Sequence, residues 1–224
     1  MPNIILAIDT SINYCSVAIY NKKKIHELSD RSNKEHNIKI LPMIQKILLL
    51  SNIKLKELNY IAFSKGPGNF TGIRISMGIA QSLSFSLKIP ILGISTLAII
   101  AEKAWRKYHQ KKILIAMHAG SNQIYWAQYI KNNKFLWTGE QTESLIQCNK
   151  IKEKIQHLTS EWLLVGDGWE KIYYQNLFKF KQNKIISPNA KDIIPFALFN
   201  IKNNAFVHAT EVTPNYLNNI FFNK

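Results

Sequence analysis

With 224 residues and 46% apolar content, the chain can build one large domain or two small ones around a substantial core. A formal charge of +15 keeps nucleic acid open as a partner, although only three of the 29 basic residues are arginine and no basic block stands out. The first ten residues carry no basic leader, the apolar run at 89–100 is too short to span a bilayer, and two cysteines make no disulfide framework. We therefore expect a reduced, cytoplasmic protein without a membrane segment.

Short apolar segments alternate with turns and helical patterns through the first half. Ser32 and Glu35 have the spacing of a capping box, and Pro42 is expected to kink the helix that follows or to reset its start. Residues 71–88 alternate like a strand in places, but their length and their position after a glycine-rich loop favour a helix. The predicted order is strands 3–9, 15–21 and 25–30, helix 32–52, strand 58–66, helix 71–88, strand 89–95 and helix 96–110.

The second half repeats this order of elements, although its sequence has little similarity to the first. Its predicted elements are strands 111–119, 124–130 and 134–139, helix 149–158, strand 161–168 and a further helix. Two β-β-β-α-β-α halves are typical of the actin-like (ASKHA) and sugar-kinase fold. We predict an α/β protein of this fold, with domains at residues 1–110 and 111–224.

The segment FSKGPGNFTG, at the junction of a predicted strand and helix, raises the question of a nucleotide site. A P-loop requires a lysine after its last glycine, where this chain has Ile73. A dinucleotide fingerprint requires a closer spacing than that of Gly66, Gly68 and Gly72, and the proline between the first two lacks an N–H donor. The residues favour a packing turn and leave a nucleotide role open.

Few residues suggest metal or nucleophile chemistry. Asp9 and Thr10 end the first strand, where the actin-like fold holds an acid that organises metal and phosphates, but acids are also common in tight turns. His36 is followed four residues later by Ile40, so no metal-binding histidine pair forms on that helix. Cys15 lies in an apolar strand and is expected to pack in the core. We predict no catalytic residue, no metal site and no cofactor on this chain.

Several segments together resemble the TsaB (YeaZ) family, most densely over residues 4–130. They are ILAIDTS, CSVAIYN, EHNIKILPMIQKIL, IAFSKGPGNFTGIRISMGIAQSLS, IPILGISTLAIIA, IYWAQY and VGDGW, of which the GPG-N-FTG-I-R run is the most specific. The chain departs from the family where relatives often read Asp-Ala-Arg and it has His118, Ala119 and Gly120.

The resemblance implies an actin-like, non-catalytic partner subunit of a TsaD-like enzyme. That complex, with a TsaE-like ATPase, transfers threonylcarbamoyl from threonylcarbamoyl-AMP to N6 of the adenosine beside the anticodon, in tRNAs reading codons that begin with A. ATP and metal are then expected on the partner subunits, and tRNA is bound through the complex. The resemblance makes the glycine loop a vestigial phosphate site, comprising Asp9, Thr10, Gly66, Gly68, Thr71 and Gly72.

Alternatives remain at this point. A small-molecule kinase of the same fold would need an intact phosphate site, and an older glycoprotease label for the family finds no nucleophile or zinc motif here. The residues leave open whether the chain forms a homodimer when alone and whether it touches tRNA directly.

Two helices of the first half are candidates for partner binding. The helix at 32–52 is apolar over more than one face, and the helix at 71–88 has two ladders of small residues that would let another helix approach closely. Packing on the chain's own sheet is the alternative explanation. The predicted partner-binding residues are Ile40, Met43, Ile44, Ile47, Arg74, Met77, Gly78 and Ser82.

Overall fold

The computed structural model describes residues 3–31, 35–134, 136–172, 180–182 and 187–217. The chain divides into two compact units, Met1–Ile99 with Pro188–Asn215 and Ile100–Ser187 with Tyr216–Lys224. The sequence predicted a division at residue 110 with everything after it in the second domain. The structure differs because residues 188–215 return to the first unit, where they pack against its sheet and its second helix.

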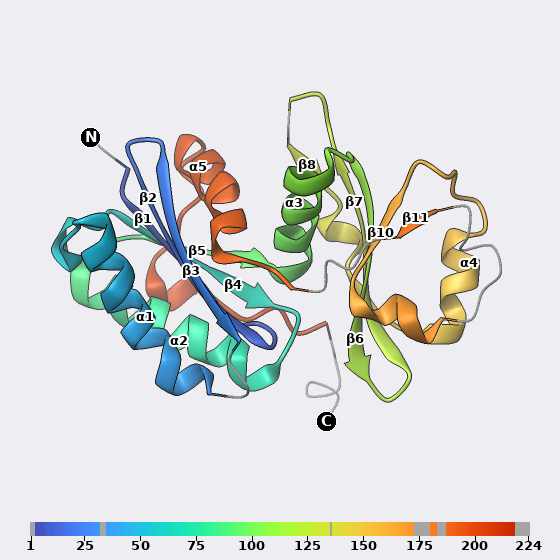
Figure 1. Ribbon diagram of the computed structural model, residues 1–224, viewed down its shortest axis with the longest axis horizontal. Helices are drawn as coiled ribbons and strands as arrows, with labels where there is room; N and C mark the ends of the chain where they lie inside the picture. The colour runs from blue at the N-terminus through green and yellow to red at the C-terminus, as the bar shows by residue number, and fades with distance from the viewer. Residues whose placement is uncertain (1–2, 32–34, 135, 173–179, 183–186, 218–224) are drawn as a thin grey trace. The chain divides into compact units, whose positions relative to one another are not determined.

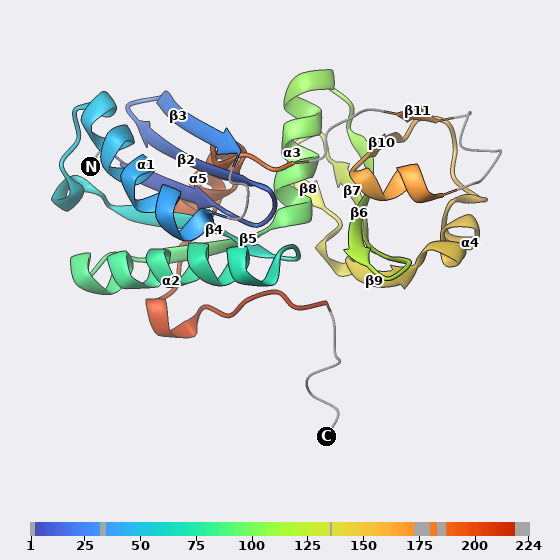
Figure 2. The same cartoon turned by 60° about the horizontal axis from the view of Figure 1, so that its bottom comes forward.

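The first unit is built on a five-stranded sheet in the order β3-β2-β1-β4-β5. The first three strands are antiparallel, and β1, β4 and β5 are parallel, as the predicted meander and crossovers require. Helices α1 and α2 cover one face of this sheet and α5 lies on the other (Figures 1 and 2). The bounds are β1 Ile5–Asp9, β2 Tyr14–Asn21, β3 Lys24–Arg31, α1 His36–Ser51, β4 Tyr60–Gly66, α2 Phe70–Leu87, β5 Ile91–Ser95, α3 Thr96–Tyr108 and α5 Ile194–Lys202.

Helix α1 begins later than predicted. Its N-cap is Glu35, whose side chain makes no capping hydrogen bond, and Ser32 lies outside the described residues. Pro42 therefore lies inside the helix rather than at its start. The helix rests on the sheet through apolar side chains recurring every three or four residues, and these join the first core cluster.

Helix α2 confirms the helical interpretation of residues 71–88. It is capped by Asn69, whose Oδ1 accepts a hydrogen bond from the backbone N–H of Gly72 at 2.9 Å. It ends at Lys88 in the left-handed conformation (φ 53°), which stops the helix and turns the chain into β5. The strand-like alternation has no structural role, because burial on this segment follows the helical period.

The second unit holds a six-stranded sheet in the order β11-β10-β6-β7-β8, with β9 paired to β7. The predicted helix at 149–158 is a 3-10 turn followed by the short helix α4. After β10 a 3-10 turn covers Asp167–Lys171, and residues 173–179 of the predicted last helix lie outside the described residues. The bounds are β6 Lys112–Gly120, β7 Gln123–Lys131, β8 Trp137–Thr138, β9 Ser144–Gln147, α4 Ile151–Ile155, β10 Leu163–Val165 and β11 Lys181–Gln182.

A buried ion pair joins α3 to β7 within the second unit. Lys131 Nζ pairs with Glu102 Oε2, and the two side chains are 4% and 3% exposed. Glu102 Oε2 also accepts a hydrogen bond from Trp137 Nε1 at 2.6 Å, and the ammonium lies 3.7 Å from the ring centroid of Trp105. The Lys131 ammonium thus contacts a carboxylate and an aromatic ring, and the Glu102 carboxylate contacts an ammonium and an indole N–H. Such contacts offset the loss of hydration that burial of two charges entails.

We predict that Lys131→Met destabilises the chain by about 3–5 kcal/mol, because it leaves the Glu102 carboxylate buried without its cation. The matched control is Lys112→Met, which removes an ion pair with Glu161 whose side chains are 40% and 63% exposed. That change is expected to cost less than about 1 kcal/mol. Urea unfolding of both variants measures the difference, and equal losses would contradict the prediction.

Candidate functional site

The glycine loop is closed against the end of the first strand. The backbone N–H of Asn69 donates to the carbonyl oxygen of Ser11 at 2.7 Å, and Thr10 Oγ1 donates to the carbonyl oxygen of Gly72 at 2.6 Å. A Cβ on Gly68 would lie 2.2 Å from the Ser11 oxygen, and one on Gly72 would lie 2.0 Å from the Thr10 oxygen. These glycines allow two backbone segments to touch, and the geometry favours the packing-turn interpretation of the loop.

Gly66 and Thr71, two other members of the predicted vestigial phosphate site, have different surroundings. Gly66 lies at the end of β4 with φ 102°, and a Cβ there would meet the carbonyl oxygen of Asn215 at 2.9 Å. Thr71 is exposed in the first turn of α2. The predicted phosphate-site residues thus lie close together in the structure. Atoms of the chain itself fill the space beside Gly66, Gly68 and Gly72.

Asp9 is buried at the end of β1 and serves as a structural anchor. Its Oδ1 accepts hydrogen bonds from the backbone N–H of Ser11 at 3.1 Å and from Ser11 Oγ at 2.7 Å, and its Oδ2 accepts from Ser16 Oγ at 3.5 Å. Ser16 Oγ in turn accepts from the backbone N–H of Ala190 at 2.9 Å, which ties the returning segment to β2. Among the described residues, no group of three histidine, cysteine or acidic side chains has the geometry to hold a metal ion.

Cys15 and His36 form a buried contact beside this anchor, with Sγ and Nδ1 3.2 Å apart. Burial, with a smaller effect of the Asp9 charge, raises the pKa of the Cys15 thiol to about 11, so the thiol stays protonated at neutral pH. Burial also lowers the pKa of His36, partly opposed by Asp9. A protonated thiol is a poor nucleophile, so the pair does not provide one.

The lowered pKa of His36 predicts a pH-dependent stability. As pH falls through about 6.5, the unfolded chain takes up a proton at His36 that the folded chain binds only at lower pH, so the free energy of unfolding decreases. His36→Gln is expected to lose less stability between pH 7 and pH 5.5 than the parent chain. Urea unfolding at both pH values tests this, with His157→Asn, at an exposed histidine, as the control that keeps the parent's slope. If His36→Gln lost as much stability between pH 7 and pH 5.5 as the parent chain, the prediction would be wrong.

Three predicted partner-binding residues on α1 lie in the chain's own core. Ile40, Ile44 and Ile47 are 0%, 4% and 0% exposed, because they point toward the sheet. Their assignment to a partner surface is therefore wrong. Four other apolar residues of the helix, Ile38, Leu41, Leu49 and Leu50, are exposed. The excess of apolar residues was visible in the sequence, but not which of them pointed outward.

The two small-residue ladders of α2 have different environments. The ladder Gly72, Ser76, Ala80 and Ser84 is buried, and Ser76 Oγ donates to the carbonyl oxygen of Ser64 on β4 at 3.2 Å. It packs on the chain's own sheet, as the alternative explanation held. The second ladder, Gly78, Ser82 and Ser86, is exposed.

The remaining predicted partner-binding residues lie at or near the surface. Arg74 is exposed, with its guanidinium 3.7 Å from the ring centroid of Phe70. Met43 and Met77 are half-buried and pack against the first core cluster. The sequence interpretation missed the exposed Phe70 and Phe85, which are 48% and 78% exposed and lie on the same side of the helix as Gly78.

Together these side chains form what we call the outer helix face. Helices α1 and α2 lie side by side over one face of the sheet (Figures 1 and 2), and we define this face by their exposed apolar and small residues. Exposed apolar side chains gathered on neighbouring elements mark interaction surfaces more often than isolated ones do. The outer helix face consists of Ile38, Leu41, Leu49 and Leu50 on α1 and Phe70, Gly78, Ser82 and Phe85 on α2.

The GDGW turn of the second unit packs in a similar way to the glycine loop. A Cβ on Gly166 would lie 2.0 Å from the carbonyl oxygen of Ala116 on β6, and Asp167 Oδ1 accepts from the backbone N–H of His118 at 2.8 Å. The acid and the glycines of this turn therefore hold it against β6.

No helix in the described ranges is both long enough and apolar enough to cross a membrane.

The chain is similar in sequence to several known proteins. Residues 19–220 match the family model described as TsaD: tRNA N6-adenosine threonylcarbamoyltransferase. A protein of Buchnera aphidicola subsp. Schizaphis graminum, named tRNA threonylcarbamoyladenosine biosynthesis protein TsaB, is 65% identical over 88% of this chain and 93% of its own length. The Escherichia coli protein of the same name is 36% identical over 96% of this chain and 94% of its own length.

A solved structure, YeaZ from Pseudomonas aeruginosa, superimposes with a TM-score of 0.85 at 27% identity, covering 95% of this chain and all of that one. Fold and site define an α/β protein with the actin-like fold, in which the glycine loop is closed against its own first strand. The chain belongs to the TsaB family.

Proposed function

We propose that the chain is the TsaB-type subunit of the machinery that makes threonylcarbamoyladenosine on tRNA, and that it supports a TsaD-like catalytic subunit without catalysing the transfer itself. The names of the two TsaB relatives, which match most of this chain, support a role in threonylcarbamoyladenosine biosynthesis. The outer helix face is the observation that supports a partner role. Its apolar side chains Leu49 and Phe85 are 81% and 78% exposed, and exposed apolar surface of this kind is typical of an interaction site.

The proposed division of labour follows from what this chain lacks in its described part. Backbone atoms fill the space beside the glycines of its loop, which supports placing ATP and metal on the TsaD-like and TsaE-like subunits. The tRNA is held through the complex in the cytoplasm, and spread lysines would add only weak, salt-dependent attraction. A kinase function is disfavoured, because the phosphate cradle that it needs is occupied by Thr10 and Ser11.

Reconstitution tests this function. The chain, a TsaD-like subunit and a TsaE-like ATPase are combined with unmodified tRNA, ATP and threonylcarbamoyl-AMP, and modified nucleoside is measured by mass spectrometry. Product is expected from the full set, none from this chain alone, and much less when this chain is omitted. Turnover by this chain alone, or full activity without it, would overturn the proposal.

A further inference from the structure

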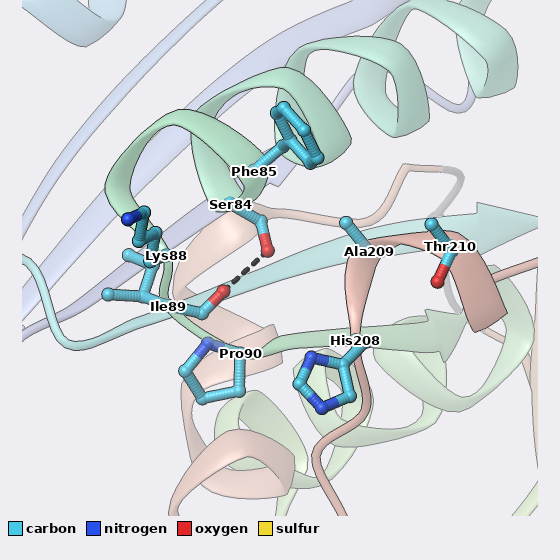
Figure 3. A pocket seen from close by; sticks show the side chains of 8 residues that line it. All are labelled: Ser84, Phe85, Lys88, Ile89, Pro90, His208, Ala209 and Thr210. Carbon is cyan, nitrogen blue, oxygen red and sulfur yellow. Dashed lines mark hydrogen bonds between the residues drawn. The ribbon is translucent and has the colours of Figure 1, made fainter.

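The first unit carries a pocket of about 600 Å³ at the C-terminal end of α2 (Figure 3). One wall is the last turn of α2, the floor is the turn into β5, and the other wall is the returning segment after Val207. A pocket of this volume lies within the range of sites for small molecules. Its lining residues are Ser84, Phe85, Lys88, Ile89, Pro90, His208, Ala209 and Thr210.

Hydrogen bonds hold both walls in place. Ser84 Oγ donates to the carbonyl oxygen of Ile89 at 2.5 Å, and the backbone N–H of Ile89 donates to the carbonyl oxygen of Ser84 at 3.1 Å. On the other wall, Gln81 Nε2 donates to the carbonyl oxygen of Ala209 at 2.9 Å. Val207 pairs with Ile91 through two backbone hydrogen bonds of 3.0 Å, which continue the sheet by one residue. The pocket is thus preformed, so a ligand would not have to order its walls.

The lining combines apolar surface with one sign of charge. Ile89 and Pro90 supply an apolar floor and Ala209 an apolar part of the wall, and Figure 3 shows the pyrrolidine of Pro90 next to the imidazole of His208. Lys88 supplies a cation, and none of the eight lining residues is acidic. The nearest acid along the returning segment, Glu211, already accepts the backbone N–H of His208 with its Oε1 at 3.2 Å.

We propose that this pocket binds an amphipathic organic anion: a flat apolar body lying on the Ile89–Pro90 floor, with one carboxylate, sulfonate or phosphate group toward Lys88. The apolar part follows from the floor, and the anionic group follows from Lys88, the charged residue among the eight that line the pocket. The site is separate from the outer helix face except for Phe85, which borders both. It does not depend on the proposed function.

A fluorescence titration of the full chain with 8-anilinonaphthalene-1-sulfonate tests the site, since this probe has a flat apolar body and one anionic group. Saturable binding at one site per chain is expected. Lys88→Glu is expected to weaken it at least tenfold, and Ala209→Trp, which fills the pocket, to abolish it. The neutral analogue N-phenyl-1-naphthylamine is expected to bind at least fivefold more weakly than the sulfonate.

Leu49→Ser is the matched control, because it removes exposed apolar surface from α1 without touching the pocket, and it should bind the probe like the parent chain. Thermal melting of each variant verifies its fold. Absence of saturable binding, unchanged binding in Lys88→Glu and Ala209→Trp, or loss of binding in Leu49→Ser would each overturn the site. Equal binding of the neutral analogue would overturn its selectivity for anions.

Discussion

Leu49→Glu is expected to separate the chain from a TsaD-like partner while leaving it folded. The side chain is 81% exposed, so in the free chain the new carboxylate stays in water and costs little. In a complex that covers the outer helix face, the same charge would be buried without a partner, at a cost of several kcal/mol. A micromolar complex is held by only about 8 kcal/mol, so the dissociation constant should rise at least a hundredfold. Calorimetric titration with the partner measures it.

Two further substitutions separate binding from folding. Lys202→Glu also adds an acid at an exposed position, but on α5, which lies on the other face of the sheet from α1 and α2, and it should retain binding within a few fold. Ile47→Glu places the charge in the core and should unfold the chain, since Ile47 is fully buried. Wild-type affinity in Leu49→Glu would mean that the partner binds elsewhere, and an unfolded Leu49→Glu would mean that this side chain is needed for the fold.

Gly72→Ala is expected to destabilise the first unit by more than about 3 kcal/mol. The added Cβ would lie 2.0 Å from the carbonyl oxygen of Thr10, and both atoms belong to segments that cannot rotate away. The substitution would also disturb the hydrogen bond from Thr10 Oγ1 to the Gly72 carbonyl oxygen. Loss of soluble protein, or a large fall in the urea midpoint, is the expected observation.

Gly78→Ala is the matched control on the same helix. A Cβ at Gly78 meets no atom within 4 Å, and alanine is preferred to glycine inside a helix by about 1 kcal/mol. This variant is expected to be slightly more stable than the parent chain. If Gly72→Ala unfolded at the same urea concentration as the parent, the close contact between the glycine loop and β1 would not contribute to stability as we infer.

Much of the fold could be predicted because it depends on local patterns. The buried run at Ile5–Asp9 and the turn at residues 22–23 follow from side-chain periodicity and turn chemistry, whereas the cap at Asn69 was not predicted. Ile73 in place of the P-loop lysine was enough to argue against a P-loop, and the spacing of the glycines argued against a dinucleotide fingerprint, since both motifs depend on specific residues at fixed spacing.

Other features depended on contacts between distant segments. Residues 188–215 have no pattern that assigns them to the first unit, and their place is set by contacts such as Ala190 with Ser16. The buried environment of His36 likewise comes from its packing against Cys15, far from it along the chain.

The sequence by itself determined the family, the fold class and the excess of apolar residues on the first helix. Only the tertiary structure decided that Ile40, Ile44 and Ile47 face inward while Leu41 and Leu49 face water. A helix that is apolar on two sides satisfies the same periodicity in either orientation, so the side that is buried depends on which sheet residues it meets. Three of the side chains predicted on α1 for partner binding are therefore part of the chain's own core, and a partner surface on the two helices stays a prediction.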